Sequence, residues 1–272
     1  MTPLLAAEWL KLRKRWMARI LALIMYAIIA LLFWGIGASN ERVNAIMPRA
    51  WLTALFAAAI YVAPFIWPIL AGSWAGSEYS WGTVRMILSR RPTRSQFVLA
   101  GIAVNLLAVG IALLGSLVVA TVAGVVVAVL TGNPIVDTTG LDAGFAVTVV
   151  KMFLATWYIL AFYVVLAFAA GTVFRSGAVG IGVGLGLNLA ELILTGIFTA
   201  LGGFWESMAR HFPTIYTAAL TVRIISGAVT RHFIHADSTT PGIPESLVAM
   251  TIYIAVPLAL SLILVRTRDV TA

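Results

Sequence analysis

The sequence predicts an all-α integral membrane protein with six transmembrane helices. Hydrophobic residues make up 61% of the 272 positions, only 10% are charged, and the mean hydropathy is +1.02. This composition excludes an ordinary soluble domain. A helix that crosses the roughly 30 Å hydrocarbon layer needs about 20 mainly apolar residues. Residues 1–272 are therefore expected to form a single transmembrane domain. Its spans are expected near 17–38, 50–75, 97–130, 144–174, 177–200 and 247–266.

The positive charges indicate the orientation of the chain. Twelve of the 18 basic residues fall on one side of the predicted spans and six on the other. Under the positive-inside rule, this bias places both termini in the cytoplasm. The net charge of +8 is thereby explained by topology and lipid contact, and no nucleic acid is expected as a partner.

The first 16 residues predict a helix on the membrane surface, over residues 3–16. Apolar side chains recur on one face and basic side chains on the other, which is typical of an interfacial helix on an anionic leaflet. The alternative is a basic anchor that only orients the first span. The apolar face comprises Leu5, Trp9, Leu12 and Trp16, opposite Lys11, Lys14 and Arg15.

The second span is expected to be irregular. Pro64 and Pro68 flank Trp67. Each proline removes a backbone donor and clashes with the preceding turn, so a kink is predicted.

Residues 76–96 form a polar island between the second and third apolar blocks. The island carries Glu78 and four arginines, yet it has little of the composition of a loop. Tyr79 to Leu88 can form a short helix, and Glu78 at its start would suit the helix dipole. Thr93 and Gln96 have the spacing of a capping box, which predicts a helix start. An ordered charged segment of this kind indicates a partner outside the membrane.

The fifth span combines close-packing glycines with a polar face. Gly180 and Gly184 have the small-xxx-small spacing that lets helices approach closely in lipid. Asn188, Glu191 and Thr195 fall on one face further along. Because an ionised carboxylate is costly within a span, Glu191 has either a functional or a structural role, and the sequence leaves both open.

Residues 201–246 are expected to form a partly helical external region between spans five and six. Thr214 to Val229 is apolar enough for one or two helices. His232 and His235 have a spacing that can bind a metal, but no acidic or cysteine partner accompanies them. We therefore interpret them as loop histidines and expect no metal site.

Several kinds of chemistry have no motif in this sequence. The lysines are Lys11, Lys14 and Lys151, and none follows a glycine-rich phosphate-binding loop. Neither H-E-x-x-H nor G-x-S-x-G occurs, and the chain has no cysteine. The chain is therefore not expected to be an enzyme or to bind a cofactor.

Three segments of the sequence carry a resemblance to a known family. The N-terminal run from Ala7 to Arg13 resembles an E-x-x-K-L-[RK] opening, and Glu78 to Arg85 is similar to an E-x-x-x-G-T-x-R segment, followed by Leu88 and then by Arg91 to Arg94. Arg268-Asp269 resembles the usual C-terminal ending. On these motifs and the six-span layout, the chain resembles the permease subunits of ABC-2 type transporters, also called type V or exporter-like.

This resemblance implies a subunit driven by a separate ATPase. It implies two permease copies, or one copy with a paralogue, bound to two cytoplasmic ATPase subunits that hold ATP and Mg²⁺, in a bacterial inner membrane. Residues 78–90 would be the coupling helix, with the N-terminal helix beside it. Spans one, two and five would line the interface between permeases and the pathway. The implied coupling residues are Glu78, Trp81, Gly82, Thr83, Arg85, Leu88, Arg91 and Arg94. The interfacial helix contributes Glu8, Lys11 and Arg13. The seam between permeases, or the pathway, would contain Gly180, Gly184, Asn188, Glu191 and Thr195.

Two other functions remain open at this stage. A self-contained secondary transporter or channel would use Glu191 as a proton or ion site, although such proteins usually carry an inverted repeat that we do not find. A membrane scaffold or immunity protein would only bind a ligand. For the permease, we expect export of an amphipathic compound, a peptide or a lipid.

Overall fold

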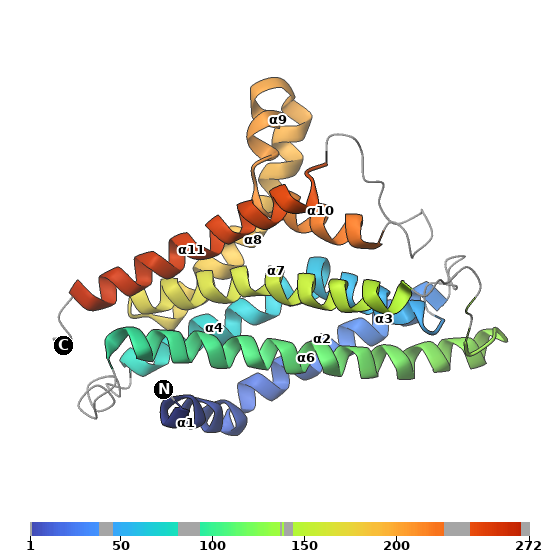
Figure 1. Ribbon diagram of the computed structural model, residues 1–272, viewed down its shortest axis with the longest axis horizontal. Helices are drawn as coiled ribbons and strands as arrows, with labels where there is room; N and C mark the ends of the chain where they lie inside the picture. The colour runs from blue at the N-terminus through green and yellow to red at the C-terminus, as the bar shows by residue number, and fades with distance from the viewer. Residues whose placement is uncertain are drawn as a thin grey trace.

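A computed structural model describes residues 2–37, 46–80, 93–136, 138, 144–225 and 240–267. Within these residues six helices are long and apolar enough to cross a membrane, and each overlaps a predicted span (Figure 1), so the structure contains six candidate spans. They are α2 (Trp16–Gly37), the continuous run Arg49–Ser80, α6 (Arg94–Thr131), α7 (Phe145–Val173), α8 (Gly177–Leu201) and α11 (Ile243–Thr267).

The second span lies at the centre of the bundle. It consists of α3 (Arg49–Ala57), a π-helical turn (Ala58–Val62) and α4 (Ala63–Ser80), and 78% of its apolar window is buried. The irregularity predicted from the prolines takes the form of this π turn, which ends just before Pro64. Because proline donates no backbone hydrogen bond, the ladder is already weakened there, and π turns concentrate at such interruptions.

The outer spans expose most of their apolar surface. Only 11% of the apolar window of α11, 17% of that of α8 and 28% of that of α2 is buried within the chain. Large side chains such as Leu31, Val118 and Ile263 point outward with more than half of their surface exposed. In water such surfaces would drive association, whereas in a membrane lipid tails solvate them.

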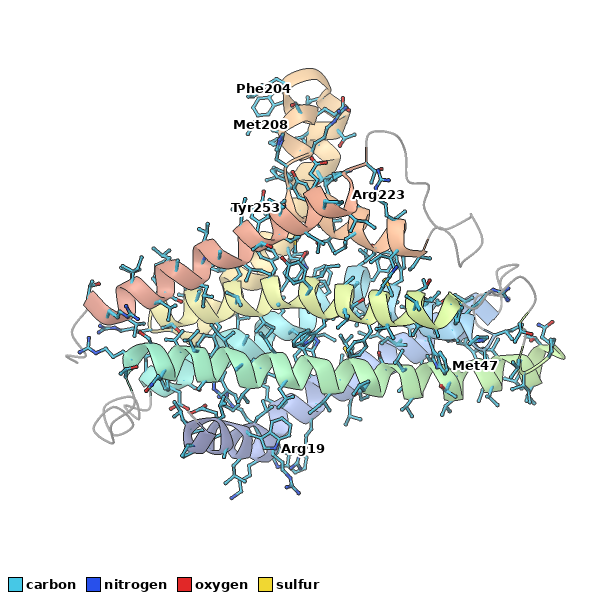
Figure 2. The ribbon with its side chains drawn as sticks, in the orientation of Figure 1. Arg19, Met47, Phe204, Met208, Arg223 and Tyr253 are labelled. Carbon is cyan, nitrogen blue, oxygen red and sulfur yellow. The ribbon has the colours of Figure 1, made fainter. Side chains whose placement is uncertain are left out.

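Part of α8 projects from the bundle. Burial along this helix ends at Glu191, and its C-terminal half rises obliquely from the other helices together with α9 (Gly203–Ala209), as Figure 1 shows. Gly202 and Gly203 have φ of +67° and +57°, a backbone conformation that lets the chain reverse direction between α8 and α9. Phe204 and Met208 lie near the tip of the projection (Figure 2).

Helix α10 (Pro213–Ile225) returns the chain to the bundle, where it contacts α7 and α11. Residues 201–246 are therefore partly helical, as predicted, and α10 accounts for most of the apolar run that begins at Thr214. His232 and His235 lie outside the described residues.

The N-terminal helix is shorter than predicted. Helix α1 spans Thr2–Lys14, Arg15 interrupts the helix, and Trp16 already begins α2, where it is 74% exposed. The predicted apolar face therefore lacks Trp16 and runs from Leu5 to Leu12, packed against the core. Its position at the membrane surface stays a prediction.

Candidate functional site

The structure brings the N-terminal helix to the end of the second span. The ammonium of Lys11 on α1 lies 2.7 Å from Oε1 of Glu8 and 3.0 Å from Oε1 of Glu78 on α4. Glu8 is 1% exposed and Glu78 is 5% exposed. One lysine thus joins two buried carboxylates from helices that are far apart in the sequence.

Further side chains complete this site. The indole Nε1 of Trp74 donates to Oε2 of Glu8 at 3.2 Å. The guanidinium of Arg15 lies 4.9 Å from the centre of a Trp74 ring and donates to the Ser77 hydroxyl at 2.8 Å. We call Glu8, Lys11, Arg15, Trp74, Ser77 and Glu78 the α1–α4 ion cluster.

The charges of the α1–α4 ion cluster balance, since two carboxylates face two cations. Burial opposes the charge on Lys11, but its hydrogen bonds to and the charges of Glu8 and Glu78 outweigh that cost, so the pKa of Lys11 is raised. Burial lowers the pKa of Arg15, and Glu78 and Glu8 partly offset this effect. Buried charges are tolerated only where they are paired in this way, so removal of one member should be costly.

Glu78 does not begin a short helix, contrary to the prediction. Helix α4 includes Glu78 and Tyr79 and is described as far as Ser80, so Glu78 stands inside that helix. Because a buried carboxylate is costly, Lys11 and Arg15 compensate for its charge. The predicted coupling residues Trp81, Gly82, Thr83, Arg85, Leu88 and Arg91 lie outside the described residues.

The predicted capping box at the start of α6 is confirmed. The Thr93 hydroxyl accepts from the amide of Gln96 at 3.3 Å, and the Gln96 side chain accepts from the amide of Thr93 at 3.0 Å. Arg94 Nη1 donates to the carbonyls of Val265 and Arg266 on α11, at 3.2 and 3.4 Å. Arg94 is thus directed toward the C-terminal end of α11.

Arg13 takes no part in the α1–α4 ion cluster. Its side chain is exposed, and its carbonyl accepts from Nη2 of Arg19 at 2.6 Å. Arg19 points away from the bundle (Figure 2). Of the three residues predicted on the interfacial helix, the structure therefore joins Glu8 and Lys11 to Glu78, which the resemblance predicts as a coupling residue, and leaves Arg13 apart.

Gly180 and Gly184 pack inside the chain. A Cβ on Gly180 would lie 2.8 Å from the Cα of Gly72, and one on Gly184 would lie 2.6 Å from Cβ of Pro68. The predicted close approach therefore occurs between α8 and α4. Because α4 and α7 of the same chain occupy this face of α8, a dimer seam on α8 would have to use its other faces.

The polar face of α8 is held by a contact with α10. Glu191 is 6% exposed, and its Oε2 accepts from the Thr214 amide at 3.2 Å and from the Thr214 hydroxyl at 2.8 Å. Because Thr214 is the second residue of α10, its amide has no acceptor within that helix. Glu191 thus caps α10. Asn188 Nδ2 and Thr195 Oγ1 are buried and have no hydrogen-bond partner among the described residues.

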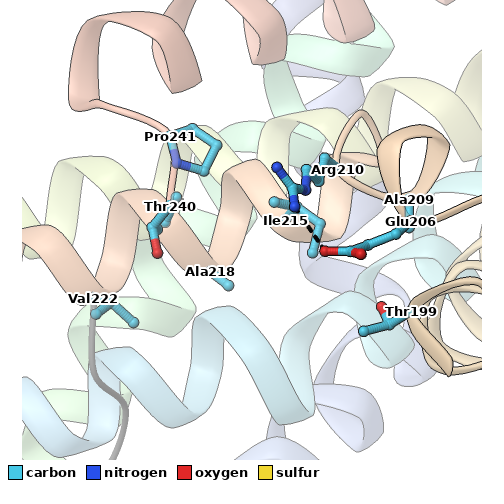
Figure 3. A pocket seen from close by; sticks show the side chains of 10 residues that line it. Thr199, Glu206, Ala209, Arg210, Ile215, Ala218, Val222, Thr240 and Pro241 are labelled. Carbon is cyan, nitrogen blue, oxygen red and sulfur yellow. Dashed lines mark hydrogen bonds and ion pairs between the residues drawn. The ribbon is translucent and has the colours of Figure 1, made fainter. Parts of the chain in front are cut away.

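A cavity of about 250 Å³ lies on other elements, between the end of α8, α9, α10 and the stretch before α11 (Figure 3). The ion pair of Arg210 and Glu206, with 2.7 Å between Nη2 and Oε1, lies on one wall. The remaining wall is mainly small and apolar, with Ala218 and Val222 from α10. Within the part of the chain that the structure describes, no three His, Asp or Glu side chains gather to hold a metal ion.

Two signals in the sequence were missed. Gly72 and Gly76 have the same small-xxx-small spacing as Gly180 and Gly184, and they form the other side of the α4–α8 contact. Trp74 and Glu78 are four residues apart, on the face of α4 that meets α1. Both patterns cross residue 75, where the prediction separates the second span from the polar island 76–96.

The fold and the buried ion cluster define a multi-pass, all-helical membrane protein with six candidate spans. A family model described as "ABC-2 family transporter protein" matches residues 4–191, and the chain belongs to this family. It is a permease component, of a kind that typically has no ATPase domain, and the family implies an ABC transporter complex with an ATPase partner. A search of curated proteins found no significant match. The family match includes the α1–α4 ion cluster and ends at Glu191, so α9, α10 and α11 lie beyond it.

Proposed function

We propose that this chain is the membrane-spanning permease subunit of an ATP-driven exporter, coupled to a separate cytoplasmic ATPase through residues 78–90. ATP and Mg²⁺ would bind to that ATPase and not to this chain. In this proposal both termini and the α1–α4 ion cluster lie on the cytoplasmic side of a bacterial inner membrane, and α1 lies at the membrane surface beside the coupling segment.

One observation carries the proposal: the α1–α4 ion cluster includes Glu78, the first residue of the segment that resembles a coupling helix. Lys11 on α1 binds this glutamate, which precedes Trp81 by three residues. Glu8 and Glu78 are also the glutamates that begin the two family-like motifs. A buried, charge-balanced joint is stiff, because separating its members would leave a charge unpaired. Displacement of the coupling segment by an ATPase would therefore move α4 and α1 together.

From α4 the displacement can reach the rest of the bundle. Gly72 and Gly76 place the backbone of α4 directly against that of α8, without side chains between them. Tightly packed helices shift as units rather than deform, which is the usual basis of two-state transport. ATP binding would bias the two states through the coupling segment.

The assembly we propose contains two ATPase subunits and two permeases, either two copies of this chain or one copy with a paralogue. The exposed faces of α2 and α8 are available for the second permease. The substrate class we propose is an amphipathic compound, a peptide or a lipid, since the spans are lined by Trp, Phe, Leu and glycine.

The test is ATP hydrolysis by the assembled complex with a Glu78→Ala permease. Allosteric coupling of ~1–3 kcal/mol corresponds to about 5–150-fold, so hydrolysis should fall by at least about fivefold. Glu78→Gln, which keeps the shape of the side chain, should show the same direction. Membrane insertion should be unchanged for both variants. Glu206→Ala, which removes an exposed ion-pair partner on α9, serves as the matched control. Unchanged hydrolysis in both Glu78 variants would refute the coupling role.

A further inference from the structure

The two ends of the predicted coupling segment are each attached to a terminal helix of the chain. At its start, Glu78 on α4 binds Lys11 on α1. Beyond its other end, four positions after residue 90, Arg94 on α6 binds backbone carbonyls of α11. Helix α11 lies beyond the family match, so its attachment is not part of what the family defines.

The contact between α6 and α11 is reciprocal. Arg94 Nη1 donates to the carbonyls of Val265 and Arg266 on α11, at 3.2 and 3.4 Å. In return, Arg266 Nε donates to the Ser95 hydroxyl at 2.7 Å. Each helix thus supplies an arginine to the other at the point where α6 begins and α11 ends.

Both charges are unfavourable within their own helices. Glu78 is a carboxylate on α4 that is only 5% exposed, and Arg94 stands at the N-terminal end of α6, where the helix dipole is positive. In each case a distant helix supplies the compensation: Lys11 from α1 for Glu78, and backbone carbonyls of α11 for Arg94. Two locally unfavourable charges that are each compensated by a distant helix indicate a functional constraint rather than chance.

We propose that Arg94 is a positioning residue that makes α11 move with the coupling segment. The inference rests on the proposed function, because it takes residues 78–90 to be the part that the ATPase displaces. Its consequence is that an ATPase stroke reaches two separate places in the bundle. One is α1 with α4, through Glu78; the other is the last span, through Arg94.

The test is hydrogen exchange on the complete transporter complex, with and without ATP and Mg²⁺, followed over the last turns of α11. Without nucleotide, the amides in these turns should exchange about fivefold faster in Arg94→Ala than in the wild type, because the variant loses a cation that stabilises this part of α11. Addition of ATP should change exchange at the end of α11 in the wild type and leave it unchanged in Arg94→Ala. Arg94→Lys, which keeps a positive charge but only one donor group, should fall between the two.

Two further variants keep the inference falsifiable. Ser95→Ala removes the bond to Arg266 and retains Arg94, so it should weaken the ATP response in a chain that folds. Arg210→Ala removes an exposed, ion-paired arginine on α9 and should behave as the wild type. An ATP response at α11 that survives in both Arg94→Ala and Ser95→Ala would overturn the inference, even if Glu78→Ala still lowered hydrolysis. Failure of the proposed function would show separately, as unchanged hydrolysis in the Glu78 variants.

Discussion

At the scale of single residues, Lys11 has the most demanding position. Its ammonium donates to both Glu8 and Glu78, at 2.7 and 3.0 Å. Its side chain is 39% exposed while the two carboxylates are almost fully enclosed. Water therefore screens part of the pairing on the lysine side, and the carboxylates bear most of the cost when the lysine is lost.

We expect Lys11→Met to destabilise the protein by roughly 2 kcal/mol, below the ~3–5 kcal/mol typical of fully enclosed pairs, because solvent reaches the lysine. Thermal unfolding of the purified protein measures this loss. Lys14→Met, an exposed position on the same helix, is the control and should change little. Lys11→Met combined with Glu78→Gln should recover part of the loss; a double variant no more stable than Lys11→Met would contradict the pairing.

The difference in stability between the wild type and Lys11→Met should depend on pH in a way that follows from the raised pKa of Lys11. A group whose pKa is raised on folding contributes its stability below the unfolded value, 10.5, and loses it only as the pH rises beyond the folded value. The stability gap between the wild type and Lys11→Met should therefore be constant across neutral and mildly alkaline pH. A gap that disappears between pH 7 and 9 would contradict this assignment.

Glu191 is the residue at which the alternative function can be tested. As a cap of α10 it needs an oxygen that accepts from Thr214, which glutamine also offers. Glu191→Gln should therefore retain transport and nearly all stability, whereas Glu191→Leu should lose ~1–3 kcal/mol because the Thr214 donors are left without an acceptor. Transport and thermal unfolding of both variants measure this. If Glu191→Gln is stable but inactive, a proton or ion site at Glu191 is favoured instead.

At the scale of elements, the contact between α4 and α8 is determined by glycines. A Cβ on Gly76 would lie 1.8 Å from the amide nitrogen of Gly177, so an alanine there cannot be accommodated by a change of side-chain rotamer. Either α4 or the start of α8 must shift, and both belong to the route from Glu78 into the bundle. The α4–α8 contact thus joins the helix that carries Glu78 of the α1–α4 ion cluster to α8.

Gly76→Ala should destabilise the protein by about 3 kcal/mol, at the upper end of the cost of overpacking, and should lower ATP hydrolysis by the complex. Gly182→Ala is the matched control on α8, since a Cβ there meets nothing within 4 Å. Alanine at this position should stabilise the helix by up to ~1 kcal/mol. Thermal unfolding measures the melting temperatures of Gly76→Ala and Gly182→Ala, and similar values would contradict a tight α4–α8 contact.

Much of the element layout could be predicted from the sequence, because hydropathy and length determine which segments can span a membrane. The capping box at Thr93 and the apolar run from Thr214 to Val229 were also local signals; the first is confirmed, and α10 covers most of the second. The error at Glu78 arose because membrane thickness does not decide where a helix ends: α4 continues past the last apolar residues to Ser80. The pairing of Lys11 with Glu78 joins positions 67 residues apart, and no local pattern in one sequence encodes such a contact.

At the scale of the whole molecule, one end of the bundle differs in its contacts and family coverage from the projection made by α8 and α9. The end that holds α1, the C-terminal turn of α4, the start of α6 and the end of α11 contains the α1–α4 ion cluster and the Arg94 contact (Figure 1). The projection made by α8 and α9 belongs to the part of the chain that extends past the family match. The end of the bundle that we propose is driven by the ATPase thus lies mainly within the family match, and the region beyond residue 191 is where we expect differences in substrate to lie.

The central claim is that the end of α4 meets the ATPase, and cross-linking tests it most directly. The chain has no cysteine, so Ser80→Cys, at the exposed end of α4, introduces a unique attachment point for a photo-cross-linker. Ile135→Cys, exposed beyond the far end of α6, is the control. In the assembled complex, the Ser80 variant should form a cross-linked product with the ATPase and the Ile135 variant should not. If Ser80→Cys yields no such product, or is labelled from outside intact cells by a membrane-impermeant maleimide, the account is contradicted.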